Sequence, residues 1–529
     1  MTFTEGEALR TGGAAASRVE IAPADIVIGR DILELITAAM YTDPMSIYRE
    51  YVQNAADAID DAREEGLVGR GDTPRIEIAL DQDSRTVRIR DNGVSIPAHA
   101  FARRLLAIGG SAKRGTTRRG FRGIGRLAGL GYCQELLFRG RAEGEAAVTE
   151  VKWDARALRQ ALRSLTPDDN LSTTIRDIAE VVRQSTDGMP ARFFEVELRK
   201  VVRIKNDVLL NPELVSGYLG HVAPVPFDPD FAFGAEIGEC LAAHGVREPV
   251  EICVNGGAPL SRPFTSSFDV SKIQTDRFTA VSFVEVPGVD GGIDAVGWVL
   301  DHGYYGSLSR SGGIGGLRIR SGDMQVGGSD IVAELFTEPR FNGWAVAEFH
   351  VLTPKIVPNG RRDNFEYNAH YANLQSHLAR LAGDLSRACR SRSRTRQTLR
   401  TIKERIVRTE GDLPLVRTIP SKLAFRDRQL EAMKTTLTRC VIAVAQVDGH
   451  EEERSAVERR IATLQTKIER ARKENGNGKV FARLPAAKRQ IYAEVLSGIY
   501  ETLGDLPLAH ETVLRLLKQA SKVRRRPAR

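Results

Sequence analysis

Cysteine is scarce in this sequence and lacks its usual arrangements. The 529 residues contain five cysteines, none in a Cys-x-x-Cys pair: Cys133, Cys240, Cys253, Cys389 and Cys440. Disulfide frameworks and structural zinc sites need grouped cysteines. We therefore expect neither of them, and we expect buried or unreactive thiols in a reducing cytoplasmic compartment.

Long apolar runs are also missing. No uninterrupted stretch approaches the roughly 18 to 20 residues that a membrane-spanning helix needs, and residues 1–20 lack a basic segment followed by an apolar one. We expect neither membrane insertion nor Sec-dependent secretion. The composition, 42% hydrophobic and 27% charged, excludes a disordered or fibrous chain. At about 150 residues per domain, the length suggests three or four folding units.

Several enzyme motifs are absent. Residues 476–480 read GNGKV, which lacks the hydroxyl that follows lysine in a phosphate-binding P-loop. The segment HEEER from His450 is not the His-Glu-x-x-His of zinc hydrolases. The glycines of GGIGG, residues 312–316, have no βαβ pattern around them. A P-loop ATPase, a zinc hydrolase and a dinucleotide-binding protein thus have no support.

The net charge of +8 is modest for this length, but the positive charge gathers toward the C-terminus. Residues 380–410 hold ten basic and three acidic residues, and the tail from Arg515 holds seven basic residues and no acid. A solvated helix face with a frayed tail explains this pattern. A strip that contacts nucleic-acid phosphates is the alternative explanation.

The pattern of hydrophobic residues changes along the chain and predicts an α+β protein. Residues 26–62 look helical and residues 75–90 look like a strand, a turn and a strand. Short β-like runs dominate residues 195–365, and the sequence beyond Tyr371 is helical. Val457, Ile461, Leu464 and Ile468 give two heptads of a short coiled coil.

The first chemically interesting element is IYREYVQNAADAIDDAREEG. Asp43 and Pro44 are a good helix start and Gly66 is a good stop, so we expect a helix over about 44–65. Three polar residues would then lie within an arc of about 60°, namely Glu50, Asn54 and Asp57. This face is either a solvated polar surface or part of a site for Mg²⁺ and phosphate, because Mg²⁺ prefers oxygen ligands.

Two further elements follow. The strand in RIRDNGVSIP ends in Asp91, which is either part of a tight turn or a carboxylate that accepts a hydrogen bond from an exocyclic amine. In the second reading, Gly93 leaves room for a flat ring. The stretch 105–131 is rich in glycine and arginine, and suits a mobile lid or a phosphate-binding helix start. Its relevant residues are Lys113, Arg114, Arg118, Arg119, Gly123 and Gly125.

The order and spacing of these three elements resemble the motifs of the GHKL, or Bergerat-fold, ATPases, and the context is most similar to the Hsp90-like HtpG branch. The resemblance implies a Bergerat α/β sandwich over 1–205, a β-rich middle domain over 206–375, and a helical, basic, dimerising region over 376–529. It also implies ATP and Mg²⁺ as cofactors. It assigns Glu50 to polarising the attacking water, Asn54 to Mg²⁺, Asp57 to the pocket edge and Asp91 to the adenine amine. The remaining nucleotide-binding positions are Gly93, Lys113, Gly120, Gly123, Ile124 and Gly125.

The resemblance extends to PKIVPNGRRDNFE, residues 354–366, which is similar to a middle-domain loop that brings an arginine to the γ-phosphate. Arg361 or Arg362 would be that residue, although an arginine pair in such a loop is often simply exposed. Two departures stand out. Ser95 replaces the usual second glycine after Asp91, and no Gly-Thr pair precedes the strand FFEVEL to support that aspartate.

Two functions remain. One is a chaperone-like ATPase, a homodimeric clamp that remodels a protein client when ATP closes it. The other is a nucleic-acid-associated clamp, similar in logic to MutL or MORC proteins, that uses the basic C-terminal region. A GHKL histidine kinase is disfavoured because only a short segment, without room for a phospho-accepting helix, precedes the ATP domain.

Overall fold

The structure is a computed structural model of the whole chain, which forms two compact units. One comprises residues 1–302 and 306–383, and the other comprises 303–305 and 384–529. The division into domains at 205 and 375 stays a prediction. The structure describes residues 43–68, 73–107, 125–164, 171–184, 188–271, 274–308, 313–447, 451–476, 484 and 486–522.

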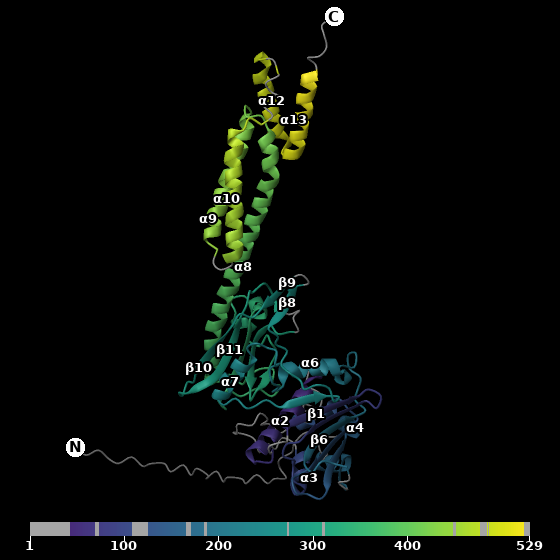
Figure 1. Cartoon of the computed structure of the whole chain (residues 1–529). Helices are drawn as coiled ribbons and strands as arrows, with labels where there is room; N and C mark the ends of the chain where they lie inside the picture. The colour runs from purple at the N-terminus through teal and green to yellow at the C-terminus, as the bar shows by residue number, and fades with distance from the viewer. Residues whose placement is uncertain are drawn as a thin grey trace, which may run out of the picture. The chain divides into compact units, whose positions relative to one another are not determined.

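The N-terminal part of the first unit is built on a seven-stranded sheet in the order β5-β4-β3-β6-β2-β1-β7 (Figure 1). The antiparallel pair β1–β2 confirms the predicted strand, turn and strand. The last strand, β7, pairs in parallel with β1, so a segment beyond residue 205 completes this sheet. The strands are β1 Arg75–Asp81, β2 Thr86–Asp91, β3 Glu135–Arg141, β4 Val148–Asp154, β5 Ala179–Gln184, β6 Phe193–Arg199 and β7 Glu251–Val254.

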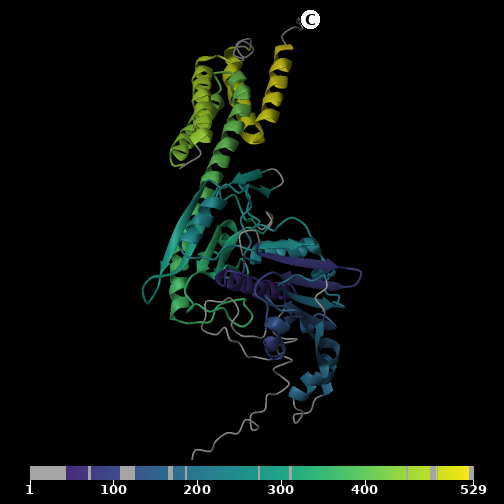
Figure 2. The same ribbon diagram turned by 60° about the horizontal axis from the view of Figure 1, so that its bottom comes forward.

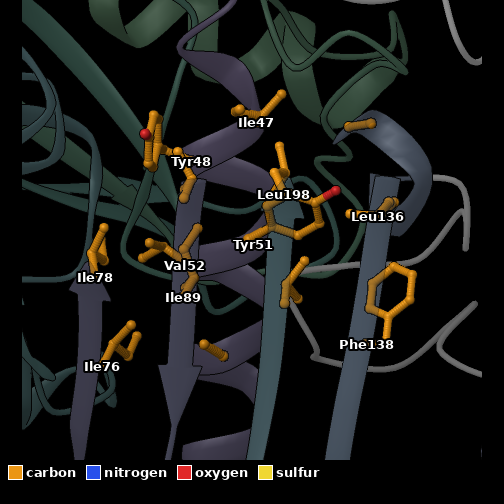
Figure 3. Close-up of a cluster of buried hydrophobic side chains, with 14 of the residues drawn as sticks. Ile47, Tyr48, Tyr51, Val52, Ile76, Ile78, Ile89, Leu136, Phe138 and Leu198 are labelled. Atoms are coloured by element: carbon orange, nitrogen blue, oxygen red, sulfur yellow. The ribbon is translucent and has the colours of Figure 1, made fainter. Parts of the chain in front are cut away.

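One face of this sheet carries the core. Buried and exposed residues alternate along β1, so Ile76 and Ile78 point to one side. Against that side lies α2 (Ser46–Glu64), whose Tyr48, Tyr51 and Val52 face the sheet in Figure 3. Each such side chain contributes about 1.5–3 kcal/mol by leaving water. Other helices of this part are α3 Ala98–Leu106, η3 Gly125–Gly131, α4 Ala155–Ser164, α5 Leu171–Ile178, η4 Val208–Leu210 and α6 Pro212–Val222.

The ends of α2 follow the sequence closely. The Asp43 carboxylate accepts a hydrogen bond from the Met45 N–H at 3.0 Å, so it caps the turn that leads into the helix. At the other end, Gly66 has φ +68° and the Leu67 N–H donates to the Ala62 carbonyl. Glycine reaches this left-handed conformation without strain. The predicted helix is confirmed, and its polar residues lie on one face as the spacing predicts.

A five-stranded sheet in the order β10-β11-β14-β12-β13 follows. Its interior holds a buried charge network in which Arg262 pairs with Asp323 and Glu348, and Glu348 also pairs with Arg320. The elements here are α7 Gly234–Ala243, β8 Ser267–Ser271, β9 Gln274–Arg277, β10 Ala280–Pro287, β11 Ile293–Asp301, β12 Gly316–Ser321, β13 Met324–Val326, η6 Ala333–Leu335, η7 Pro339–Trp344 and β14 Val346–Val351. The expected α+β fold with a β-rich middle is confirmed.

The second unit is helical, as predicted. Long helices lie side by side in both Figure 1 and Figure 2, and the predicted heptad residues Val457, Ile461, Leu464 and Ile468 are buried against α8 and α9 of the same chain. The heptad is therefore a seam of an intrachain bundle and is not free to join a second chain. The helices are α8 Ala369–Thr418, α9 Ala424–Ala445, α10 Glu451–Lys473, α12 Ala486–Leu503 and α13 Leu506–Lys522.

The five cysteines are unpaired. All five are free, and four are buried. Burial raises the pKa of Cys133 to about 12, so its thiol stays protonated at neutral pH. Across the residues that the structure describes, no helix is long and apolar enough to cross a membrane.

Candidate active site

The polar face of α2 is buried. Glu50 is 6% exposed, Asp57 is fully buried, and Asn54 is half-buried. Burial lowers the pKa of Arg247, but Asp60, 2.7 Å away, outweighs this effect and, with the charge of Asp57, holds the pKa above its usual value. The three predicted residues share one face, but Asp57 lies toward an arginine that the sequence did not indicate. A solvated polar surface is therefore excluded for Glu50 and Asp57.

Glu50 meets the predicted arginine loop. Arg362 Nε lies 2.9 Å from Glu50 Oε1, although its N–H is not aligned for a hydrogen bond to that oxygen. On the other carboxylate oxygen, a Cβ added to Gly125 would overlap Glu50 Oε2. Glu50 thus sits between the start of η3 and the loop that follows β14. Any side chain at position 125 would have to displace the Glu50 carboxylate from this position.

Arg49 holds the arginine loop in place. Its Nη2 donates to the Arg361 carbonyl at 2.9 Å, and its Nη1 donates to the Arg362 carbonyl at 3.3 Å. Arg49, which directly precedes Glu50 in the sequence, thus fixes both carbonyls. The Arg361 side chain is exposed, whereas that of Arg362 is only 13% exposed and turns toward Glu50. The geometry thus separates two arginines that the sequence left equivalent.

Asp91 ends β2 in a buried position, 4% exposed. Burial raises the pKa of Asp91 well above its usual value, while the Gly93 N–H, 3.0 Å from Oδ1, and the charge of Arg192 oppose that rise. Asp91 therefore has only modest compensation for a buried negative charge. An added amine donor would supply what the site lacks.

The turn after Asp91 is pressed against α2. A Cβ added to Gly93 would lie 2.6 Å from the Ala58 carbonyl oxygen, and the Val94 N–H donates to that same oxygen at 2.9 Å. Because α2 and the turn after β2 are in contact here, Asp91 and Asn54 lie on adjacent elements. The end of β2 thus combines a tight turn with a buried carboxylate.

A row of paired residues runs across the sheet from Asp91 to a threonine. Strand pairing places Phe194 opposite Asp91, Gly140 opposite Phe194, and Thr149 opposite Gly140. Thr149 is thus three strands, or about 14 Å, from Asp91. Ser95 Oγ packs on Gly140, and both it and Thr149 Oγ1 are buried without a hydrogen-bond partner. At that distance Thr149 cannot support Asp91, so the structure assigns no threonine to that role.

Four predicted nucleotide-binding residues lie outside the described residues, as do three lid arginines: Lys113, Gly120, Gly123 and Ile124, and Arg114, Arg118 and Arg119. Sequence reasoning also missed Arg49, Arg192 and Arg247. Their partners are distant in the chain, and the only local signal was that Arg49 directly precedes Glu50 in REYVQNAADA.

Comparison with known proteins agrees with this geometry. Residues 42–181 match the family model described as histidine kinase-, DNA gyrase B-, and HSP90-like ATPase. The chaperone protein HtpG of Alcanivorax borkumensis is 25% identical over 161 residues, which cover 27% of this chain and 26% of that protein. HtpG of Mycolicibacterium gilvum is 36% identical over 92 residues, 16% of this chain and 14% of the relative.

HtpG of Streptomyces coelicolor is 34% identical over 96 residues, 16% of this chain and 15% of the relative. The chain thus spans about a quarter or less of the length of these curated relatives. The family model covers α2, Asp91 and η3, which build the site. Residues 42–181 therefore match the ATPase domain of the GHKL family, and the chain is similar over part of its length to HtpG chaperones.

Proposed function

We propose that the protein binds and hydrolyses ATP, and that it works as an Hsp90-like dimeric clamp in the cytoplasm whose closure remodels a protein client. The observation that carries the proposal is the contact between Glu50 and Arg362, with Gly125 against the same carboxylate. A carboxylate that would act as the general base, an arginine and the glycine at the start of η3 converge there. These are the parts that phosphoryl transfer to water requires.

The residues take distinct roles. Glu50 would accept the proton of the attacking water, and Asp91 would accept a hydrogen bond from the adenine amine, with Asp57 at the edge of the pocket and Gly93, Gly120, Gly123, Ile124 and Gly125 around the nucleotide. Lys113 would add charge near the phosphates. Asn54 is half-buried one turn from Glu50, and its side chain makes no hydrogen bond among the described residues. It could therefore hold Mg²⁺, which would neutralise phosphate charge.

Arg362 would change partners during the cycle. In this structure it contacts Glu50, which gives its largely buried charge a partner. When ATP arrives, we infer that the guanidinium moves to the γ-phosphate and frees the carboxylate for the water. Nucleotide binding and loop movement would then be one two-state switch.

Asp91→Asn should weaken ATP binding. The amide offers a donor where the adenine amine needs an acceptor, and we expect a loss of at least tenfold in affinity, about 1.4 kcal/mol. Calorimetric titration of the full chain with ATP and Mg²⁺ measures this change. Because an amine donor favours the ionised carboxyl, affinity for the unaltered protein should also rise with pH toward the raised pKa of Asp91. Equal affinity of both proteins would remove Asp91 from the site.

The dimer is proposed at α12 and α13. One face of this hairpin packs inside the chain through Leu496, Tyr500 and Val513. The apolar residues that stay exposed are Ile491, at 62%, and Val495, at 54%, with Leu503, Leu508 and Leu516. Such apolar surface favours a protein partner, and a second copy would suit a clamp.

Ile491→Lys with Val495→Lys should convert a dimer to a monomer in the full chain, because two charges would enter an apolar interface. Light scattering measures the mass. The matched control is Val441→Lys with Ile442→Lys on α9, which is equally exposed and apolar. A monomeric unaltered protein, or loss of the dimer only in the control, would contradict this assignment.

A second function, as a nucleic-acid-associated clamp, is favoured by one feature of the helical unit. A groove of about 390 Å³ between α8 and the end of α9 is lined by three arginines, Arg387, Arg390 and Arg394. Hydroxyls and an amide from Ser391, Thr395, Thr398 and Gln446 complete it. Exposed arginines beside hydroxyls suit a phosphate backbone.

Replacing the three arginines by glutamine should weaken duplex DNA binding and reduce the slope of log affinity against log salt by about 2.7, or roughly 0.9 per contact. The control replaces Arg428, Arg460 and Arg472, which are exposed but paired with glutamates. Equal slopes for both triple variants, or no retention of DNA, would leave the chaperone-like clamp as the sole proposal.

A further inference from the structure

A second pocket lies beside the arginine loop. Its volume is about 440 Å³, within the range of roughly 300–1,000 Å³ typical of small-molecule sites. Residues from α2, α6, β12, β13 and the loops around them form its walls. The charged and titratable wall residues are Arg49, Arg318, Arg361 and His221, against Asp43 and Asp363.

Arg318 of β12 is a buried cation on this wall. It is 2% exposed, its Nη1 donates to the Ile314 carbonyl at 2.7 Å, and its Nη2 donates to the Gly313 carbonyl. Its Nε has no hydrogen-bond partner, and within the described part of the chain no carboxylate lies within 4.0 Å of its guanidinium. Burial lowers the pKa of Arg318 to about 10. A buried charge that meets only carbonyls is costly, and an anion would offset that cost.

Gln325 of β13 adds an unused acceptor. Its Nε2 donates to the Gly327 carbonyl at 3.1 Å, while its Oε1 is buried and accepts no hydrogen bond. Leaving a buried amide oxygen unpaired costs about 1–3 kcal/mol. Arg318 and Gln325 therefore present a cationic donor and a neutral acceptor on the same pocket wall.

The pocket is connected to the candidate active site through the backbone. The Gly327 N–H donates to the Arg362 carbonyl at 2.8 Å, and a Cβ on Gly327 would lie 2.7 Å from the Asp363 carbonyl oxygen. Arg49, also on the pocket wall, holds the Arg361 and Arg362 carbonyls. A molecule that moves either wall would move the residue that contacts Glu50.

We propose that this pocket binds a small organic anion, with a phosphate or carboxylate at Arg318 and a hydroxyl that donates to Gln325, and that its occupancy tunes ATP turnover. The proposed anion binding is argued from the pocket residues alone. The effect on turnover rests on the proposed ATPase function. The ligand is distinct from ATP, because none of the pocket residues is a proposed adenine or Mg²⁺ contact.

The test is thermal unfolding of the full chain with glycerol 3-phosphate or glycerate, each against potassium chloride at matched ionic strength. One arm carries a phosphate and the other a carboxylate, and both carry hydroxyls. We expect at least one to raise the midpoint of unfolding in a saturable way, and Arg318→Met to weaken the fitted dissociation constant at least tenfold. Arg340→Met, at an exposed arginine of the same unit, is the control and should not change it.

Gln325→Leu gives a second variant of similar volume in case Arg318→Met does not fold, and it should also weaken binding. A midpoint that follows ionic strength alone, or identical shifts in the pocket variants and the control, would overturn the proposal. ADP titration of each protein separates the two hypotheses. If ADP does not bind while the anion still binds, the ATPase proposal fails and the anion site remains. If ADP binds and the anion does not, the anion site fails and the ATPase proposal remains.

Discussion

Arg362→Ala is expected to reduce ATP turnover by up to roughly 10³ to 10⁵ fold, the range seen when an arginine that stabilises the transferring phosphoryl group is lost. ATP binding should change little, because the proposed adenine and Mg²⁺ contacts remain. The loss of turnover is expected because Arg362 lies 2.9 Å from Glu50, in a loop held by Arg49. Steady-state hydrolysis and calorimetric titration of the full chain measure the two quantities separately.

Arg361→Ala is the matched control for this loop. The Arg361 side chain is exposed and only its carbonyl is held, a contact that alanine preserves. Its turnover should stay within about threefold of the unaltered protein, a change below about 0.7 kcal/mol. Equal losses in both variants would show that the loop needs its overall charge and not a particular guanidinium.

Glu50→Ala is expected to slow hydrolysis by roughly 10² to 10⁴ fold, the contribution typical of a general base. ATP affinity should persist. Single-turnover hydrolysis with saturating protein measures the chemical step directly.

Glu50→Gln controls for the space left by alanine, since it keeps the side-chain shape against Gly125 but cannot take a proton. It should be nearly as slow as the alanine variant. Normal turnover in Glu50→Gln would make the Glu50 carboxylate a structural partner of Arg362 only.

The sequence predicted those parts of the fold that depend on neighbours in the chain. Asp43 and Gly66 marked the ends of α2 to within a few residues, because capping is a local hydrogen-bonding requirement. Asp91 and Gly93 could be assigned to a strand end for the same reason. In contrast, no local pattern indicated that β7 pairs with β1, since parallel pairing is decided by packing between distant segments.

Local sequence patterns predicted only one side of the site, and the arginine loop was indicated by the family resemblance alone. The spacing of Glu50, Asn54 and Asp57 follows from helix geometry, but their partners do not. Arg362 contacts Glu50 although 312 positions separate the two residues in the sequence, and Arg49 and Arg361 are equally far apart. No periodicity in the sequence connects such distant residues. Val457 and Ile461 show the opposite failure, because a heptad looks the same whether its partner helix belongs to the same chain or to a second one.

The central claim is that Glu50 and Arg362 act as one unit in ATP hydrolysis, and a double-mutant cycle on the turnover rate of the full chain tests it most directly. If the two residues serve one transition state, the Glu50→Ala, Arg362→Ala double variant should be about as slow as the slower single variant, far faster than the product of the two losses implies. Fully multiplicative losses, or turnover that neither variant changes, would contradict the account.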